Sequence, residues 1–288
     1  MTVINVLYLP RDDRLRTVVR TALDFVEEVY REEVLSGLKV VAFDYDDETD
    51  IGNVARIAHA EGFGITKHEQ CKVVLGTPVF FKPHYKPKHH YIWIPIWRHY
   101  WGSEVLKMVA HETAHHLYYS VMDSSERDSL AMSVLTDVPE IEEVARKVVS
   151  GTPSDQLVTV VESVSYFMSE IAAIYITQNY FKMLKRGPET PVSAIPGIAT
   201  AVDILYHKER PSGFIRLLLI LYPEEVNPIL STIYRKIAVE KVDLPRFRET
   251  LHRVFARYIK KLPVDVLESN RAKYGVLYGR EPLIPFSD

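Results

Sequence analysis

The sequence predicts an α+β protein, in which a mixed α/β subdomain with a small sheet is followed by an all-helical subdomain. Two observations support this fold class. Up to about residue 100, short apolar runs alternate with stretches of helical spacing. After Trp101 nearly every stretch has helical spacing, and the connectors are polar and rich in proline and glycine. We therefore predict a first subdomain over residues 1–122 and a second over residues 123–288.

Short apolar runs in the first subdomain predict strands at residues 4–10, 37–46, 72–81 and 90–97, with a bend in the third at Gly76 and Pro78. Helical spacing predicts helices between these strands, at about residues 12–36 and 50–61. The same spacing then predicts helices at 103–122, 126–149, 155–184, 193–207, 212–221, 224–239 and 244–261. The last roughly 25 residues, which end in PLIPFSD, read as an irregular tail.

The composition excludes several classes of protein. A single cysteine, Cys71, rules out an intrachain disulfide. A net charge of -3 gives no general attraction to nucleic acid or to a membrane surface. No stretch approaches the roughly 18 uninterrupted apolar residues of a membrane span, and the N-terminal apolar run is too short for a signal peptide. We therefore expect a cytoplasmic protein without a membrane partner.

The stretch HETAH, residues 111–115, lies inside the helix predicted at 103–122, which Ser103 can cap and Glu104 can favour through the helix dipole. His111 and His115 are four residues apart, so their rings lie one turn above each other and can bind one zinc ion. Glu112 lies about a hundred degrees round the helix, where its carboxylate can take a proton from a water that zinc acidifies. This spacing predicts metal-dependent hydrolysis. The alternative is an ordinary amphipathic helix with histidines at its border.

A catalytic zinc ion usually has three protein ligands, and the sequence leaves three candidates for the third. Glu170 lies in YFMSEIAAIYI, where a carboxylate in so apolar a helix requires a compensating partner. Glu162 lies about two turns earlier on a neighbouring face. Asp155, in GTPSD, can also be read as a helix N-cap.

HETAH followed by FMSEIAAIY resembles the gluzincin metallopeptidases. The resemblance implies a zincin-like fold and one zinc ion per chain, held by His111, His115 and Glu170, with Glu112 as the general base. Ala173 and Tyr175 match the small and aromatic positions after the glutamate, whereas Ile171 stands where glycine is common. Enzymes of this kind often use a tyrosine or histidine to stabilise the oxyanion, and the available residues are Tyr206, His207, Tyr222, Tyr234 and His252.

The predicted strand at 90–97 contains Pro95, which cannot donate to a sheet ladder and therefore predicts an edge strand. In the resembled enzymes, an edge strand before the metal helix binds the peptide in extended form. We therefore expect Trp93, Ile94 and Ile96 to contact a peptide or protein substrate. The basic and aromatic stretch 80–101 could instead bind single-stranded nucleic acid, which is the weaker reading because aromatic residues that alternate along a strand more often pack in a core.

The function predicted from the sequence is that of a zinc-dependent metallopeptidase. The alternative, from another class, is a catalytically inactive zincin-like scaffold that acts as a binding protein. Peptide turnover in the presence of zinc distinguishes the two.

Overall fold

The computed structural model describes residues 3–62, 71–74, 77–80, 83–135 and 245–278, together with the single positions Ser169, Ala172, Ala173, Ile176, Thr177 and Phe181. The chain divides into two compact units, of which the first comprises Met1–Val121, Ile176–Leu184 and Tyr258–Asp288. The second comprises Met122–Tyr175 and Lys185–Arg257. Helices accompany a small sheet, so the protein is of the α+β class.

The sheet of the first unit has four strands in the order β1-β2-β6-β5. These are β1 (Asn5–Tyr8), β2 (Lys39–Asp44), β5 (His84–Lys86) and β6 (Tyr91–Ile96). The strands β1, β2 and β6 are parallel, and β5 pairs with β6 in the antiparallel direction. The predicted strand at 72–81 consists of two short strands, β3 (Cys71–Val74) and β4 (Thr77–Phe80), which pair with each other in a separate sheet.

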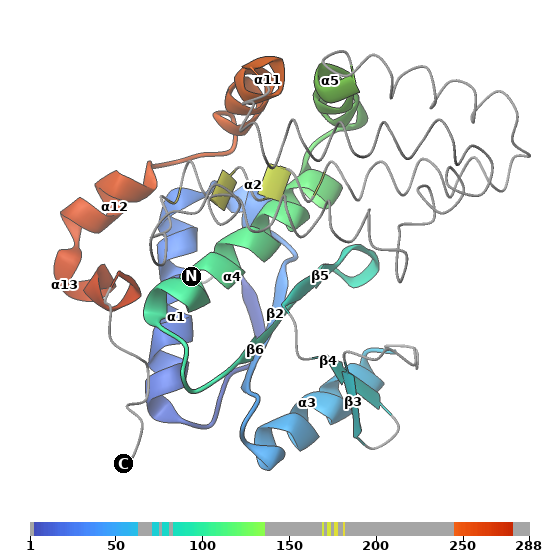
Figure 1. Ribbon diagram of the computed structural model, residues 1–288, viewed down its shortest axis with the longest axis vertical. Helices are drawn as coiled ribbons and strands as arrows, with labels where there is room; N and C mark the ends of the chain where they lie inside the picture. Colours follow the sequence, from blue (N-terminus) through green and yellow to red (C-terminus); the bar gives the residue numbers. More distant parts are fainter. Residues whose placement is uncertain are drawn as a thin grey trace, which may run out of the picture. The chain divides into compact units, whose positions relative to one another are not determined.

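Helices cover both faces of the four-stranded sheet (Figure 1). On one face, α3 (Glu48–Ala60) packs against alternate residues of the central strands, among them Val41, Phe43 and Trp93. The residues between them are buried too, and the period of two in a strand turns them to the other face. There α1 (Asp13–Val29) and α4 (Gly102–His116) pack against each other, and α4 also contacts β6.

The predicted helix at 12–36 is divided in the structure. The helix α1 begins after Asp12, whose side chain accepts hydrogen bonds from the backbone N–H groups of Arg14 and Leu15 at 2.9 Å each. It ends at Tyr30, whose extended backbone forms a β-bridge with Ile259. The chain then continues as the short helix α2 (Glu32–Leu35). Pairing with a C-terminal segment therefore interrupts a helix that local spacing alone would continue.

The prediction of an irregular C-terminal tail is wrong up to residue 278, and residues 279–288 lie outside the described residues. The chain forms α12 (Pro263–Ser269), α13 (Arg271–Tyr274) and the 3₁₀ turn η4 (Gly275–Leu277), and these elements contact α1. Tyr274 is buried edge-on against Phe25 of α1, with 5.1 Å between ring centroids. Lys273 pairs with Asp24 of the same helix at 3.0 Å. Because these helices are short, packing rather than a long periodic pattern stabilises them.

The described helices of the second unit are α5 (Ser124–Leu135) and α11 (Pro245–Phe255), which contact each other. Arg257, just after α11, donates to the buried carboxylate of Glu126 in α5. The helix predicted at 244–261 ends earlier than expected, because α11 stops at Phe255. Most of the other helices predicted after residue 135 lie outside the described residues. Among the helices that the structure describes, none has the length and apolar character needed to cross a membrane.

Candidate metal centre

The HETAH motif lies in the second half of α4, a helix whose start is fixed by backbone contacts. The helix begins at Gly102, and the carboxylate of Glu104 accepts a hydrogen bond from the backbone N–H of Trp101 at 2.8 Å. Glu104 therefore caps the helix in place of the predicted Ser103. A Cβ atom at Gly102 would lie 2.2 Å from the carbonyl oxygen of Val276, so only glycine allows η4 to approach this closely.

The rings of His111 and His115 converge. Their Nε2 atoms are 3.2 Å apart, their ring centroids are 4.9 Å apart, and the planes are inclined by 77°. Two nitrogen atoms bound to one tetrahedral zinc ion at its usual bond length lie about 3.3 Å apart. His115 is buried and His111 is half-buried, so the pair lies at the boundary between the core and the solvent. The two imidazoles therefore fit two adjacent corners of a zinc site.

Glu112 follows directly on the same helix and is only 4% exposed. An ionised carboxylate at this depth requires compensating interactions, and a cation held by the adjacent histidines would supply one. The hydroxyl of Thr113, inside the motif, donates to the carbonyl of Val109 at 2.7 Å. Thr113 therefore satisfies its own polar group within the helix, which leaves Glu112 as the acid–base candidate of the motif.

The third ligand lies outside what the structure describes. Glu170, Glu162 and Asp155 are not among the described residues, and neither are the oxyanion candidates Tyr206, His207, Tyr222 and Tyr234. Next to Glu170, Ser169, Ala172 and Ala173 are helical and fully buried. Within the described part of the chain, no three histidine, cysteine, aspartate or glutamate residues are grouped so that they could hold a metal ion. The remaining oxyanion candidate, His252, is exposed on α11.

The prediction that residues 91–97 form an edge strand is wrong, because β6 lies between β2 and β5. The strand β5 pairs only with Tyr91–Trp93, whereas β2 pairs along the whole of β6. Pro95 therefore lies where β6 has one neighbour among the described strands, and its missing N–H can face the side without one. Trp93, Ile94 and Ile96, predicted to bind substrate, are at most 2% exposed. Among the described strands, the one at this end of the sheet is β5, which the sequence analysis did not identify.

Tyr85, in the middle of β5, links that strand to the end of α4. Its hydroxyl lies 3.0 Å from Nδ1 of His116, 3.2 Å from Nδ1 of His90 and 2.8 Å from Oγ of Ser120. Ser120 lies in the π-helical turn η2 (Leu117–Val121), which continues α4. His90 has a left-handed backbone with φ of 57°. A π-helical turn and a left-handed residue other than glycine are both uncommon, and the hydroxyl of Tyr85 contacts one residue of each.

Burial keeps two members of this cluster, Tyr85 and His116, uncharged. Burial, with a smaller contribution from His90, lowers the pKa of His116 to about 4, although the backbone of Val34 and Ser36 acts in the opposite direction. Burial also raises the pKa of Tyr85 to about 12, against a hydrogen bond from Ser120 that lowers it. At neutral pH the tyrosine is therefore a phenol and His116 an uncharged imidazole. The motif HETAHH thus contains two histidines that converge on one point and a third, His116, that contacts β5.

Comparisons with known proteins identify no relative of this chain: no family model, no curated protein and no solved structure matches it.

Proposed function

We propose that the protein is a zinc-dependent metallopeptidase. The observation that carries this proposal is the 3.2 Å separation of the Nε2 atoms of His111 and His115, next to a buried carboxylate, Glu112. In our proposal the two histidines bind one zinc ion per chain, and Glu170 is the third ligand. The fold that accompanies the proposal is zincin-like, with the metal helix following the sheet.

Zinc in such a site would act as a Lewis acid, which polarises a peptide carbonyl and lowers the pKa of a water molecule. Glu112 would accept the proton of the attacking water and later donate it to the leaving amine. Glu112 is suited to this role because it lies between the two histidines in the helix, one residue after His111 and three before His115, and is shielded from bulk solvent. The oxyanion-stabilising residue remains among the tyrosine and histidine candidates of the sequence.

We assign peptide binding to the outer edge of β5, in place of the buried residues of β6. The strand directly precedes β6, which leads into α4, and within the described sheet it has a partner on one side only. By resemblance to the gluzincins, an edge strand before the metal helix binds an extended peptide through backbone hydrogen bonds. Tyr85 would hold this strand against the end of α4 through His116 and Ser120.

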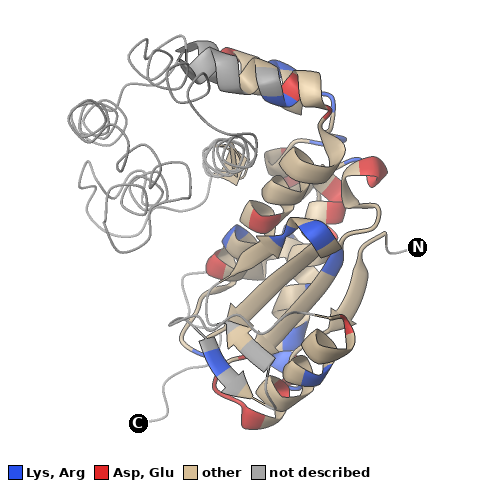
Figure 2. Cartoon of the chain, turned by 90° about the vertical axis from the view of Figure 1, so that its right-hand side faces the viewer, with Lys and Arg blue, Asp and Glu red and all other residues tan. Residues whose placement is uncertain are grey.

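A nucleic-acid partner has less support. Figure 2 shows acidic residues interspersed with lysines and arginines along the elements of the described part. Within the basic stretch, Arg98 pairs with the carboxylate of Asp44 at 2.9 Å. Lys86 is partly buried, and burial lowers its pKa. A phosphate backbone is recognised by several accessible cations together, which this arrangement reduces.

Metal content tests the proposal directly. We expect about one zinc ion per chain by elemental mass spectrometry, on protein purified without chelator or nickel. His115→Ala and Glu170→Ala should each lose the zinc, whereas His99→Ala, which removes an exposed histidine before α4, should keep it. Absence of zinc from the wild type, even after zinc is added, would refute the proposed centre. Zinc bound without turnover of any peptide would instead favour the inactive scaffold.

A further inference from the structure

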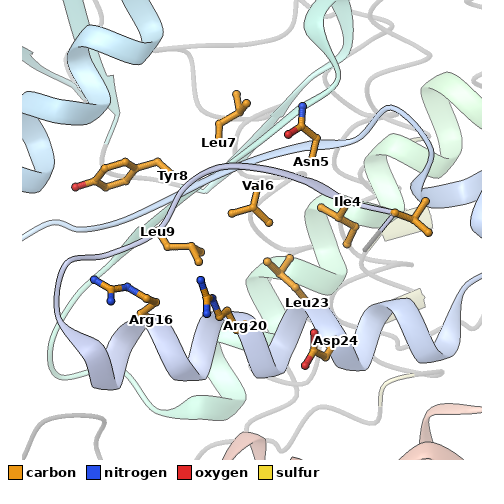
Figure 3. A pocket seen from close by; sticks show the side chains of 11 residues that line it. Ile4, Asn5, Val6, Leu7, Tyr8, Leu9, Arg16, Arg20, Leu23 and Asp24 are labelled. Atoms are coloured by element: carbon orange, nitrogen blue, oxygen red, sulfur yellow. The ribbon is translucent and has the colours of Figure 1, made fainter. Parts of the chain in front are cut away.

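The edge of the sheet formed by β1 borders a hollow. Among the described strands β1 has a partner on one side only, because it is the first in the order β1-β2-β6-β5. The hollow has a volume of about 1000 Å³ and lies between this edge and α1. Its lining consists of residues 3–9 together with Arg16, Arg20, Leu23 and Asp24 of α1 (Figure 3).

Among the described residues, no strand pairs with the outer edge of β1 at Val6. The backbone N–H of Asn5 donates to the carbonyl of Leu38 at 2.9 Å, so Asn5 faces β2. The backbone N–H and C=O groups of successive residues in a strand point to opposite sides. The N–H and C=O of Val6 therefore point away from β2. The side chain of Val6, 36% exposed, is one of the few large apolar side chains at the described surface. A second strand could thus pair with Val6 and cover its side chain.

The usable edge is short. On one side of Val6, the carboxylate of Glu27 already accepts hydrogen bonds from the N–H groups of Val3 and Ile4, at 3.1 and 3.2 Å. On the other side, the pairing of β1 with β2 shifts between Val6 and Tyr8, as in a β-bulge. A bulge of this kind limits pairing at an edge. The edge can therefore accept only a few residues of an extended segment.

Among the charged side chains that line the hollow, Arg20 differs from the others in its interactions within the described part of the chain. Each nitrogen of the Arg16 guanidinium already donates one hydrogen bond, to the carbonyls of Pro10 and Arg11 and to the carboxylate of Asp13. Asp24 pairs with Lys273 at 3.0 Å. Arg20 is exposed and has no ion pair or side-chain hydrogen bond within the described part of the chain. Figure 3 shows its guanidinium extending from α1 toward β1.

We propose that this edge binds a short, extended segment of a partner protein that carries a carboxylate side chain. The segment would pair with the outward peptide unit of Val6, cover the exposed valine side chain, and place its carboxylate on Arg20. A second copy of this chain fits less well, because its own β1 edge would bring a second Arg20 and an Asp24 that is already paired. The surface lies at the opposite end of the sheet order from β5, so it would bind a partner independently of the peptidase site.

The test uses capped tripeptides, acetyl-Val-Glu-Val-amide and acetyl-Val-Gln-Val-amide, titrated into the full-length protein. Amide chemical shifts report the site, and their concentration dependence reports the affinity. We compare the wild type with Arg20→Gln and with Arg14→Gln, a matched control that removes an exposed arginine of α1 that does not line the hollow. Sedimentation velocity on the wild type is measured at the same concentrations.

We expect the glutamate peptide to shift the amides of Val6 and its neighbours, and to bind more tightly than the glutamine peptide. Arg20→Gln should weaken the glutamate peptide about five- to tenfold, whereas Arg14→Gln should leave its affinity unchanged. Equal affinities for the two peptides, equal effects of the two arginine variants, or shifts confined to β5 and α4 would each overturn the proposal. A dimer that pairs through Val6 without peptide would overturn it in favour of self-association.

Discussion

At the scale of single residues, the proposed chemistry depends on Glu112. Glu112 is buried and directly follows His111 in the helix, and it is the only acidic residue of the HETAH motif. A general base of this type contributes by proton transfer and does not bind the metal. A substitution of Glu112 should therefore abolish proton transfer and leave metal binding intact.

Glu112→Gln should therefore keep about one zinc ion per chain and lower the turnover of peptides by roughly 10²–10⁴-fold. The amide has the size of the carboxylate but cannot accept the proton. Zinc content by elemental mass spectrometry and turnover of a fluorogenic peptide library are measured on the same preparations, with Glu33→Gln as an exposed control. Peptide hydrolysis at the wild-type rate would remove Glu112 from the mechanism.

Tyr85 gives a residue-scale prediction with a pH dependence. Its pKa is raised to about 12 in the folded protein, so the stability that it contributes is complete below its unfolded pKa of about 10 and is lost between pH 10 and 12. Near neutral pH, Tyr85→Phe should lower the free energy of unfolding by about 1–3 kcal/mol, because the buried Nδ1 of His116 loses its partner.

The difference between the wild type and Tyr85→Phe should shrink or reverse as the pH rises from 10 to 12, since only the wild type must ionise this phenol. Urea denaturation at fixed pH values measures it, and groups that titrate in both proteins cancel. A difference that stays constant across this range would show that the phenol is not buried as described.

At the scale of elements, the contact of α4 with η4 depends on the missing side chain of Gly102. A Cβ atom there would meet the carbonyl of Val276 at 2.2 Å, and backbone must move to admit it. We expect Gly102→Ala to lower the free energy of unfolding by about 1–3 kcal/mol. In Gly52→Ala, within α3, no atom beyond the neighbouring helix backbone lies within 4 Å of the new Cβ, so the free energy of unfolding of that variant should rise by about 0.5–1 kcal/mol.

Thermal and urea unfolding of both glycine variants provide the measurement. If Gly102→Ala is as stable as Gly52→Ala, the close approach of η4 to the start of α4 does not exist in solution.

Local sequence patterns predicted those strands and helices that contain a clear apolar run or a clear helical spacing. The apolar runs predicted β1, β2 and β6, and the helical spacing predicted α1, α3 and α4, although pairing of Tyr30 with Ile259 ended α1 early. The strand β5 was missed because His84–Lys86 is too short and polar to form an apolar run. Pro95 predicted an edge strand, but among the described strands β6 lacks a second neighbour only after Trp93, the last residue paired with β5.

For the candidate site, too, the sequence predicted the part that lies within one helix and not the part that depends on distant residues. The spacing of His111 and His115 within one helix predicted neighbouring rings, and their Nε2 atoms lie 3.2 Å apart. A third ligand comes from a distant part of the sequence, and no local spacing determines its approach to the pair. The choice among Glu170, Glu162 and Asp155 therefore stays a prediction.

At the scale of the whole molecule, the C-terminal residues return to the unit in which the chain begins. Lys260 and Lys261 donate their backbone N–H groups to the carbonyl of Val29, at 2.8 and 3.2 Å, and the following helices pack on α1. The first unit is therefore closed only after the second unit has been synthesised. Its stability should therefore depend on buried side chains of residues 260–278 as well as on those of the sheet.

Tyr274→Ala tests this dependence, because Tyr274 is 2% exposed and packs edge-on against Phe25. We expect the free energy of unfolding to fall by about 3–5 kcal/mol, as for other large aromatic truncations in a core. The control Val276→Ala, at a side chain that is 45% exposed, should change it by less than about 0.5 kcal/mol. All three tryptophans, Trp93, Trp97 and Trp101, lie in the first unit, so tryptophan fluorescence in urea reports its unfolding. Equal urea midpoints for the two variants would mean that the C-terminal helices contact α1 but do not stabilise the first unit, which carries the candidate metal centre.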